Sequence, residues 1–432
     1  MLIHPKIVAI DDNKSHLDAL MQGLQEFRIP AHPILYQRDD VTPHEPIGHV
    51  RIIFSDLHLL GSDEQNKKKH FGVIETLLGE LISAENGPYV LILWTRFPGQ
   101  AKELLAHLEE RLVARKRPVT VMPINKKTYI RAQGTFKNFD GFKEHLSKSI
   151  NQNPQVAALI DWEMRVLTAA GVAIASVDAL VPDDKRSEKE YSAHLELLLG
   201  QLASAAIGLH HVEGDKLGAI DLALSPILND SLIHLNKSKK QFSIWKNAYK
   251  VPGRKPKLSP ETRASLNRMV HVSNAVENYG HKDRGIVLRL DWKDEKIKTE
   301  FGYEKTEIFK YYKVKQESFD DLKIKLVMVQ VQPPCDYANR DQKFLPYALG
   351  VAVKDNNLST APQKGAVWKS PEIELNGEVY RVLVSADFLT RYSWTKLVRT
   401  PRWFRFREEI LNDLSYSFSN HLGRPGIYAF QS

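Results

Sequence analysis

The chain has 432 residues, of which 43% are hydrophobic and 26% are charged, and its formal net charge is +8. These proportions are typical of a soluble globular protein, and the length predicts two or three domains. The single cysteine, Cys335, excludes an internal disulfide. Because we find neither a signal-peptide pattern nor an apolar run of roughly 18 residues, we expect a cytoplasmic protein without a membrane span.

Charge is distributed unevenly along the chain. Residues 1–150 carry a net charge of +2, residues 151–236 carry −7 and residues 237–432 carry +13. Shifts of this kind indicate separate pieces of structure. The predicted domains are an N-terminal α/β domain at residues 1–132, a helical domain at 150–236 and a basic, β-rich domain at 260–432.

The first 130 residues alternate between short apolar runs and segments with apolar residues at helical spacing. Apolar strands that are covered on both faces and separated by helices predict a parallel, doubly wound sheet, here with five strands. The expected strands are KIVAI, PILY, VRIIFSD, YVLILWT and VTVMPI, and the expected helices are SHLDALMQGLQEF, FGVIETLLGELISA and GQAKELLAHLEERLVARK.

The rest of the chain changes in character twice. Residues 155–235 hold three Leu/Ala-rich segments at helical spacing, for which core or dimer packing is the default. Residues 237–260 hold eight Lys/Arg, no acid and Pro-containing breaks, and this composition predicts a loop or linker. From Gly285 on, β-type runs dominate until a closing helix. The expected strands are GIVLRL, IFKYYKV, KIKLVMVQV, YALGVAV and VYRVLVS, and the expected helix is REEILNDLSYSFSNHL.

Polar side chains stand where the strands of the predicted parallel sheet end. Asp11 and Asp12 end the first strand, Asp56 the third, Thr95 the fourth and Lys126 the fifth. In doubly wound sheets, ligands bind outside the carboxyl ends of the strands. Three carboxylates there repel one another, and the usual relief is a hard cation such as Mg²⁺, which prefers oxygen ligands. A carboxylate beside Mg²⁺, with a hydroxyl and an amine nearby, is suited to attack a phosphoryl group.

This set of residues resembles the receiver domain of two-component response regulators. The resemblance rests on the acidic pair in IVAIDDN, on DLHLLG after the third strand, and on the Thr and Lys after the fourth and fifth. It covers about residues 5–130 and implies that Asp56 accepts a phosphoryl group from a partner histidine kinase. The residues implied to position Mg²⁺ are Asp11, Asp12 and Asp56, and those implied to contact the phosphoryl group are Thr95 and Lys126.

Several features depart from the usual receiver. The two prolines of YQRDDVTPHEPIGH predict that the second helix is short or missing, and LLGSDEQNKKKHFG lengthens the loop after the third strand. Arg96 stands where receivers favour a small residue, and Lys127 stands where they usually have proline. These departures resemble the divergent receivers of bacterial conflict and antiviral operons. The alternative is a degenerate receiver that serves as a protein-binding scaffold.

The basic C-terminal third offers a different hypothesis. Residues 391–407, RYSWTKLVRTPRWFRFR, hold six Lys/Arg and five aromatic residues without an acid. This pattern suits stacking on bases and pairing with phosphates, and equally an interface or aromatic residues packed in a core. A nucleic-acid-binding effector is therefore the rival function. The contacts would come from Arg399, Arg402, Arg405 and Arg407.

A third hypothesis is a hydrolase that uses Cys335 as its nucleophile, which requires a histidine within hydrogen-bond reach. A structural cysteine is the commoner case. We favour a signalling protein that accepts a phosphoryl group over an enzyme with turnover. We expect a kinase or another protein as its partner, and homo-oligomer formation stays open.

Overall fold

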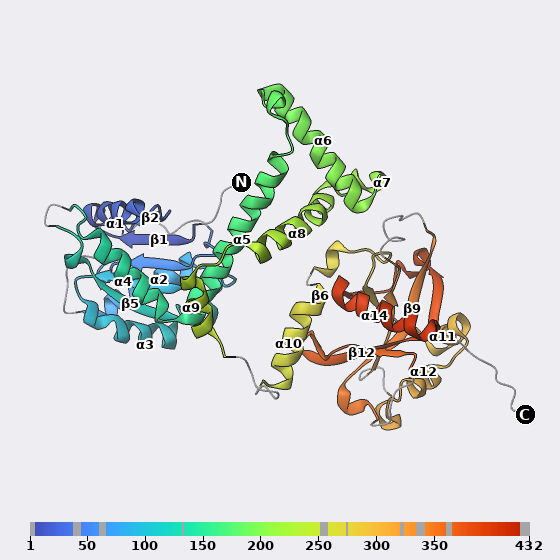
Figure 1. The fold of residues 1–432 in the computed structure, drawn as a ribbon. Coiled ribbons are helices and arrows are strands. Elements are labelled where there is room, and N and C mark those ends of the chain that lie inside the picture. Colours follow the sequence, from blue (N-terminus) through green and yellow to red (C-terminus); the bar gives the residue numbers. More distant parts are fainter. Residues whose placement is uncertain are drawn as a thin grey trace, which may run out of the picture. The chain divides into compact units, whose positions relative to one another are not determined.

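The computed structural model describes residues 5–37, 45–59, 66–131, 134–250, 258–273, 275–319, 324–333, 342–359 and 365–423. The chain divides into two compact units, each described by itself below (Figure 1). The N-terminal unit comprises residues 1–198 and 223–251, and the C-terminal unit comprises residues 199–222 and 252–432. Within the described ranges, every helix is too short or too polar to cross a membrane.

The described part of the N-terminal unit contains a five-stranded sheet in which all strands run parallel. Its order is β2-β1-β3-β4-β5, so the chain reverses direction across the sheet at β1. This confirms the predicted doubly wound sheet. The strands are β1 (Ile7–Asp11), β2 (His32–Leu35), β3 (Ile52–Ser55), β4 (Val90–Thr95) and β5 (Thr120–Asn125).

Helices cover both faces of this sheet. α2 (Lys67–Leu81) and α3 (Ala101–Arg111) share one apolar core with it, and α1 (Lys14–Glu26) and α4 (Phe139–Asn151) share another. No helix lies in the described residues between β2 and β3. Residues 38–44 of that connection and 60–65 of the loop after β3 lie outside the described residues.

The middle of the chain is helical, as predicted. Its helices are α5 (Pro154–Asp178), α6 (Glu188–Ile207), α7 (Leu209–Val212) and α8 (Lys216–His234). α5 is tied to the N-terminal unit by its Glu163, whose carboxylate accepts from Arg51 Nε at 2.7 Å and also pairs with Lys6.

A helix lies within residues 237–260, where the sequence predicted a loop or linker. α9 (Lys239–Ala248) begins with a capping box formed by Ser238 and Gln241. Asp161 of α5 accepts from Gln241 Nε2 and from Trp245 Nε1, both at 2.8 Å. The prediction was wrong over these residues because the basic composition concealed the cap and the contacts with α5.

In the described residues of the C-terminal unit, the strands form an antiparallel sheet covered on both faces. The order is β10-β12-β9-β8-β7-β13-β6, and β11 pairs with β12. One face packs against α14 (Glu408–Leu422), the other against α11 (Asp294–Phe301) and α12 (Lys305–Tyr311). α10 (Pro260–His271) contacts β11 and β6. The strands are β6 (Val272–Ser273), β7 (Ile286–Arg289), β8 (Ile324–Gln330), β9 (Phe344–Val353), β10 (Val367–Lys369), β11 (Ile373–Leu375), β12 (Glu378–Ser393) and β13 (Arg402–Phe406).

This architecture confirms the predicted β-rich module with a terminal helix, but one predicted strand is a helix, and α11, β10, β11 and β13 were not among the expected elements. The run IFKYYKV was predicted as a strand, but it forms most of α12. Glu304 and Glu307 make a capping box at its start, and Ile308, Phe309 and Tyr312 bury one side of the helix. The aromatic and β-branched composition favoured a strand, whereas the cap and the buried face stabilise a helix.

Candidate metal centre at the edge of the parallel sheet

The turns that follow β1 and β3 hold two carboxylates in place. After β1, the backbone N–H of Asn13 donates to Asp11 Oδ1 at 2.9 Å, and the Asn13 side chain caps α1 by accepting from the His16 N–H. After β3, the Asp56 N–H donates to the Ile10 carbonyl at 3.0 Å, and the Leu57 N–H donates to Asp56 Oδ1 at 2.8 Å. The backbone therefore fixes both side chains at adjacent strand ends.

The three acids named from the sequence come together at this edge. One carboxylate oxygen from each of Asp11, Asp12 and Asp56 lies within 4.8 Å of the other two. Asp11 and Asp56 are buried, while Asp12 is partly exposed. Oxygens this close can share one hard cation. The acidic cluster, as these three residues are called below, is therefore a candidate metal site.

Lys126 supplies positive charge to the acidic cluster from the end of β5. Its side chain is buried, and its Nζ lies 2.6 Å from Asp56 Oδ2 and 3.3 Å from Asp11 Oδ2. One ammonium group thus bridges two buried carboxylates. Charges removed from water in this way are tolerated only when they are paired.

The protonation of Asp11 depends on this environment. Burial raises the pKa of Asp11 to about 7, Lys126 opposes that rise, and the neighbouring Asp56 charge adds to it. In the metal-free protein, the Asp11 carboxyl therefore exchanges its proton near neutral pH. A bound cation would favour the ionised form, because it adds positive charge beside a group that burial disfavours as an anion.

Thr95 lies at the end of β4, as expected, and is fully buried. It pairs in register with Asn125 of β5, the residue before Lys126. Its Oγ1 accepts from the Phe97 N–H at 3.2 Å, which orders the turn after β4. The hydroxyl, the lysine and the acids therefore belong to neighbouring strand ends of one sheet.

The arginines of the nucleic-acid hypothesis mostly hold the C-terminal unit together. Arg405 donates to the Arg284 carbonyl at 2.8 Å and lies over the Tyr279 ring at 4.5 Å. Arg407 donates to the Val272 carbonyl at 3.1 Å, and Arg402 donates to the Tyr279 carbonyl. Arg399 is exposed, and the structure gives it no such role.

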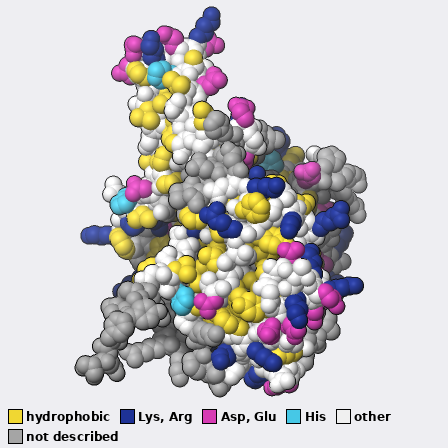
Figure 2. Space-filling model, turned by 90° about the vertical axis from the view of Figure 1, so that its right-hand side faces the viewer, with side chains coloured by type: hydrophobic (Ala, Val, Ile, Leu, Met, Phe, Trp, Pro, Cys, Tyr) yellow, Lys and Arg dark blue, Asp and Glu magenta, His cyan; other side chains and the backbone are white. Residues whose placement is uncertain are grey.

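Two aromatic residues of the stretch 391–407 are not accessible for stacking on bases. Phe404 and Phe406 are buried in the core between the sheet and α14. On the face shown in Figure 2, Lys and Arg side chains are interspersed with Asp, Glu and hydrophobic side chains. These observations favour core packing for the aromatics. Cys335 of the hydrolase hypothesis lies outside the described residues.

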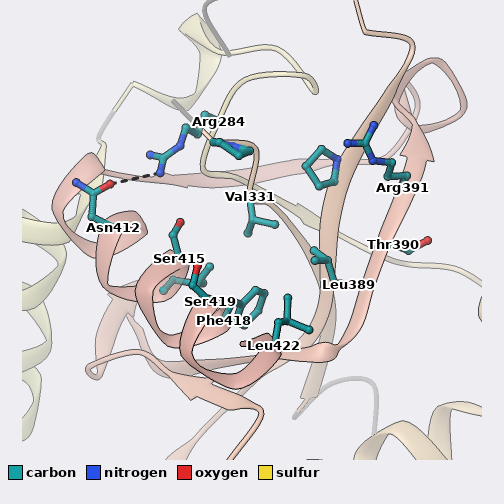
Figure 3. A pocket seen from close by; sticks show the side chains of 13 residues that line it. Arg284, Val331, Leu389, Thr390, Arg391, Asn412, Ser415, Phe418, Ser419 and Leu422 are labelled. Carbon is teal, nitrogen blue, oxygen red and sulfur yellow. Dashed lines mark hydrogen bonds between the residues drawn. The ribbon is translucent and has the colours of Figure 1, made fainter. Parts of the chain in front are cut away.

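A cavity of about 570 Å³ in the C-terminal unit was not anticipated from the sequence (Figure 3). It lies along α14, with Val331, Leu389 and Phe418 as apolar walls and Arg284 near one end. Arg284 donates to the Gln332 carbonyl at 2.7 Å, pairs with Glu408 and reaches Asn412 at 3.4 Å. Its lining comes from segments far apart in the chain, so no local motif marks it.

Comparisons of the chain with models of known protein families, with curated proteins and with solved structures find no match. The residues of the molecule itself are therefore the basis for inferring its function. Among the described residues, the acidic cluster with Lys126 combines burial, like charges and a shared counter-charge, which is the arrangement expected of a functional site.

Proposed function

We propose that residues 1–132 of the N-terminal unit form a receiver domain that binds Mg²⁺ through Asp11, Asp12 and Asp56 and accepts a phosphoryl group on Asp56 from a histidine kinase. The observation that carries this proposal is the convergence of three acids and a buried lysine at the carboxyl ends of β1, β3 and β5. The doubly wound strand order places those ends at one edge of the sheet.

The chemistry follows from the contacts of Asp56. The Leu57 N–H donates to Oδ1 and the Lys126 ammonium donates to Oδ2, so the two contacts orient the carboxylate. In the transfer, a carboxylate oxygen forms a bond to phosphorus while the bond from phosphorus to the kinase histidine nitrogen breaks, and that nitrogen keeps the electron pair. Mg²⁺, when bound, offsets negative charge on the transferred group.

The product changes the charge at the sheet edge. The acyl phosphate on Asp56 carries a charge of about −2 in place of the −1 of the carboxylate, and it adds strong acceptor oxygens. Lys126 and Thr95, at the ends of β5 and β4, are the side chains placed to respond to that charge. We propose that their response alters the contacts that the rest of the chain makes with partner proteins.

Binding of Mg²⁺ is expected to change the fluorescence of Trp94. This side chain is fully buried and stacks on Tyr129 with ring centroids 6.1 Å apart, three residues after Lys126. Titration with millimolar Mg²⁺ should give a saturable signal, and Trp94→Phe should remove it. The variant Asp18→Asn, an exposed acid of α1, should titrate like the wild type. A flat titration of the wild type would count against the metal site.

Beryllofluoride, a phosphoryl mimic, tests the phosphoacceptor. With Mg²⁺ it should slow hydrogen exchange at the ends of β3, β4 and β5 and change exchange beyond residue 132. Asp56→Asn should abolish the response, because the amide cannot form the adduct, whereas Asp18→Asn should retain it. An unchanged exchange pattern in the wild type would show that the unit is a scaffold. A cognate kinase provides the corresponding assay with a natural donor. It should transfer a phosphoryl group to the wild type and not to Asp56→Asn.

A further inference from the structure

A group of basic side chains lies beside the acidic cluster. A cavity of about 320 Å³ opens there, lined from the start of α1, from the turn after β4 and from the segment after β5. Among the described residues, its lining contains no acid and no Phe, Tyr or Trp. The lining residues are His16, Arg96, Lys126, Lys127, Ile130 and Arg131.

Three of these cations are not committed to acids. Lys126 is occupied by Asp56 and Asp11, as described above. Arg96, Lys127 and Arg131 are exposed and form no ion pair with any acid in the described ranges. Without a metal ion, Lys126 offsets one of the three charges of the acidic cluster, and the other three cations exceed the remaining two. A bound divalent cation would leave all three cations in surplus.

The backbone positions two of these cations. The Lys127 N–H donates to Asn125 Oδ1 at 3.1 Å, which starts the short helical turn η3 (Lys126–Thr128). The Arg131 N–H donates to the Thr135 carbonyl at 2.9 Å, and the Gly134 N–H donates back to the Arg131 carbonyl at 3.0 Å. Both side chains thus start from hydrogen-bonded turns, which reduces the entropy lost when they order around a ligand.

His16 adds a polar atom that lacks a hydrogen bond. Its Nδ1 is buried without a partner and lies 3.9 Å from Asp11 Oδ1. A buried polar atom beside surplus cations is suited to meet an anion.

We infer that this cavity binds a small anion of the diphosphate class. Arginine forks pair with phosphate oxygens in a bidentate way, and Arg96 and Arg131 reach the cavity from separate segments. The cavity volume of about 320 Å³ exceeds the volume of one phosphate ion. Arg96, Lys127 and Arg131 together can neutralise a ligand that carries several negative charges. Ile130 is the one apolar lining residue, so recognition would rest on charge. This ligand is distinct from the phosphoryl group on Asp56, and its binding does not depend on the function proposed for Asp56.

Calorimetric titration of the full chain with inorganic pyrophosphate, without Mg²⁺ and at low ionic strength, tests the inference. We expect saturable binding that the double variant Arg96→Gln/Arg131→Gln weakens by at least about tenfold, because each arginine supplies charge-assisted hydrogen bonds. Arg115→Gln is the matched control, since Arg115 is an exposed arginine of the same unit outside the cavity. It should bind pyrophosphate like the wild type.

Two further arms complete the test. ADP that binds as tightly as pyrophosphate would identify a nucleotide as an accepted source of the diphosphate, and binding of pyrophosphate alone would identify the free anion. Asp56→Asn should bind pyrophosphate at least as tightly as the wild type, because it removes a nearby negative charge. The inference is overturned if neither ligand binds the wild type, if the double variant binds undiminished, or if Arg115→Gln loses as much affinity as the double variant.

Discussion

Asp11→Asn is expected to stabilise the metal-free N-terminal unit at pH 8 and to abolish its binding of a divalent cation. Asp11 is fully buried, and its pKa rises from the ordinary value of 3.8 to about 7. Ionising this side chain therefore costs more free energy in the folded protein than in the unfolded chain. Asparagine removes that ionisation and keeps an oxygen that can accept from the Asn13 N–H.

The pH dependence has a definite sign. Between pH 3.8 and about 7, the folded wild type binds more protons at Asp11 than the unfolded chain does. The stability of the wild type therefore falls as the pH rises through this window and is lowest above it. A shift of this size corresponds to at most about 4 kcal/mol with the attraction to Lys126 already included, and we expect a net gain of roughly 1–3 kcal/mol in Asp11→Asn.

Denaturant unfolding in the presence of a chelator, followed by hydrogen exchange of β1 and β4, measures this difference. The advantage of Asp11→Asn should be largest at pH 8 and should shrink towards pH 5, where wild-type Asp11 is protonated. A variant that is less stable than the wild type at both pH values would contradict the assigned cost of burying Asp11. Asp18→Asn, exposed on α1, should follow the wild type throughout.

The parallel sheet could be predicted because its inner strands β1, β3 and β4 are buried on both faces. Val8 and Ile10 of β1 lie in the core with α2 and α3, while Ala9 between them lies in the core with α1 and α4. Both sides of the strand must then be apolar, and the sequence shows an unbroken run. Where that run stops, the residue reaches the sheet edge, which is why Asp11 and Asp56 could be assigned to one site.

Other features depend on contacts that one segment cannot reveal. α9 and α12 were mispredicted because local capping and burial against a distant partner outweighed composition. Lys126 bridges two carboxylates because its side chain reaches from the end of β5 to the ends of β1 and β3, and a single segment of sequence does not reveal that conformation. The basic cavity combines Arg96 with Arg131, and α3 and β5 lie between them in the chain.

Lys126→Met is expected to lower the free energy of unfolding of the N-terminal unit by about 3 kcal/mol at pH 8 without metal, because removal of one partner leaves buried charge unpaired. Asp56 loses a contact of 2.6 Å and Asp11 one of 3.3 Å. The loss should be smaller at low pH, where the carboxyls take up protons instead. Lys127→Met is the matched control, since Lys127 is exposed and its replacement should change stability by less than about 0.5 kcal/mol.

Divalent cations should restore much of the stability that Lys126→Met loses. The ammonium group and a metal ion both offset the charge of the same acidic cluster, so removing the ammonium leaves a more negative site with higher cation affinity. A ligand that binds the folded state stabilises it in proportion to the logarithm of its concentration over Kd. Titration should therefore show tighter Mg²⁺ binding in Lys126→Met than in the wild type, and none in Asp11→Asn. Weaker binding in Lys126→Met would mean that the lysine orients the carboxylates for the ion and does not compete with it.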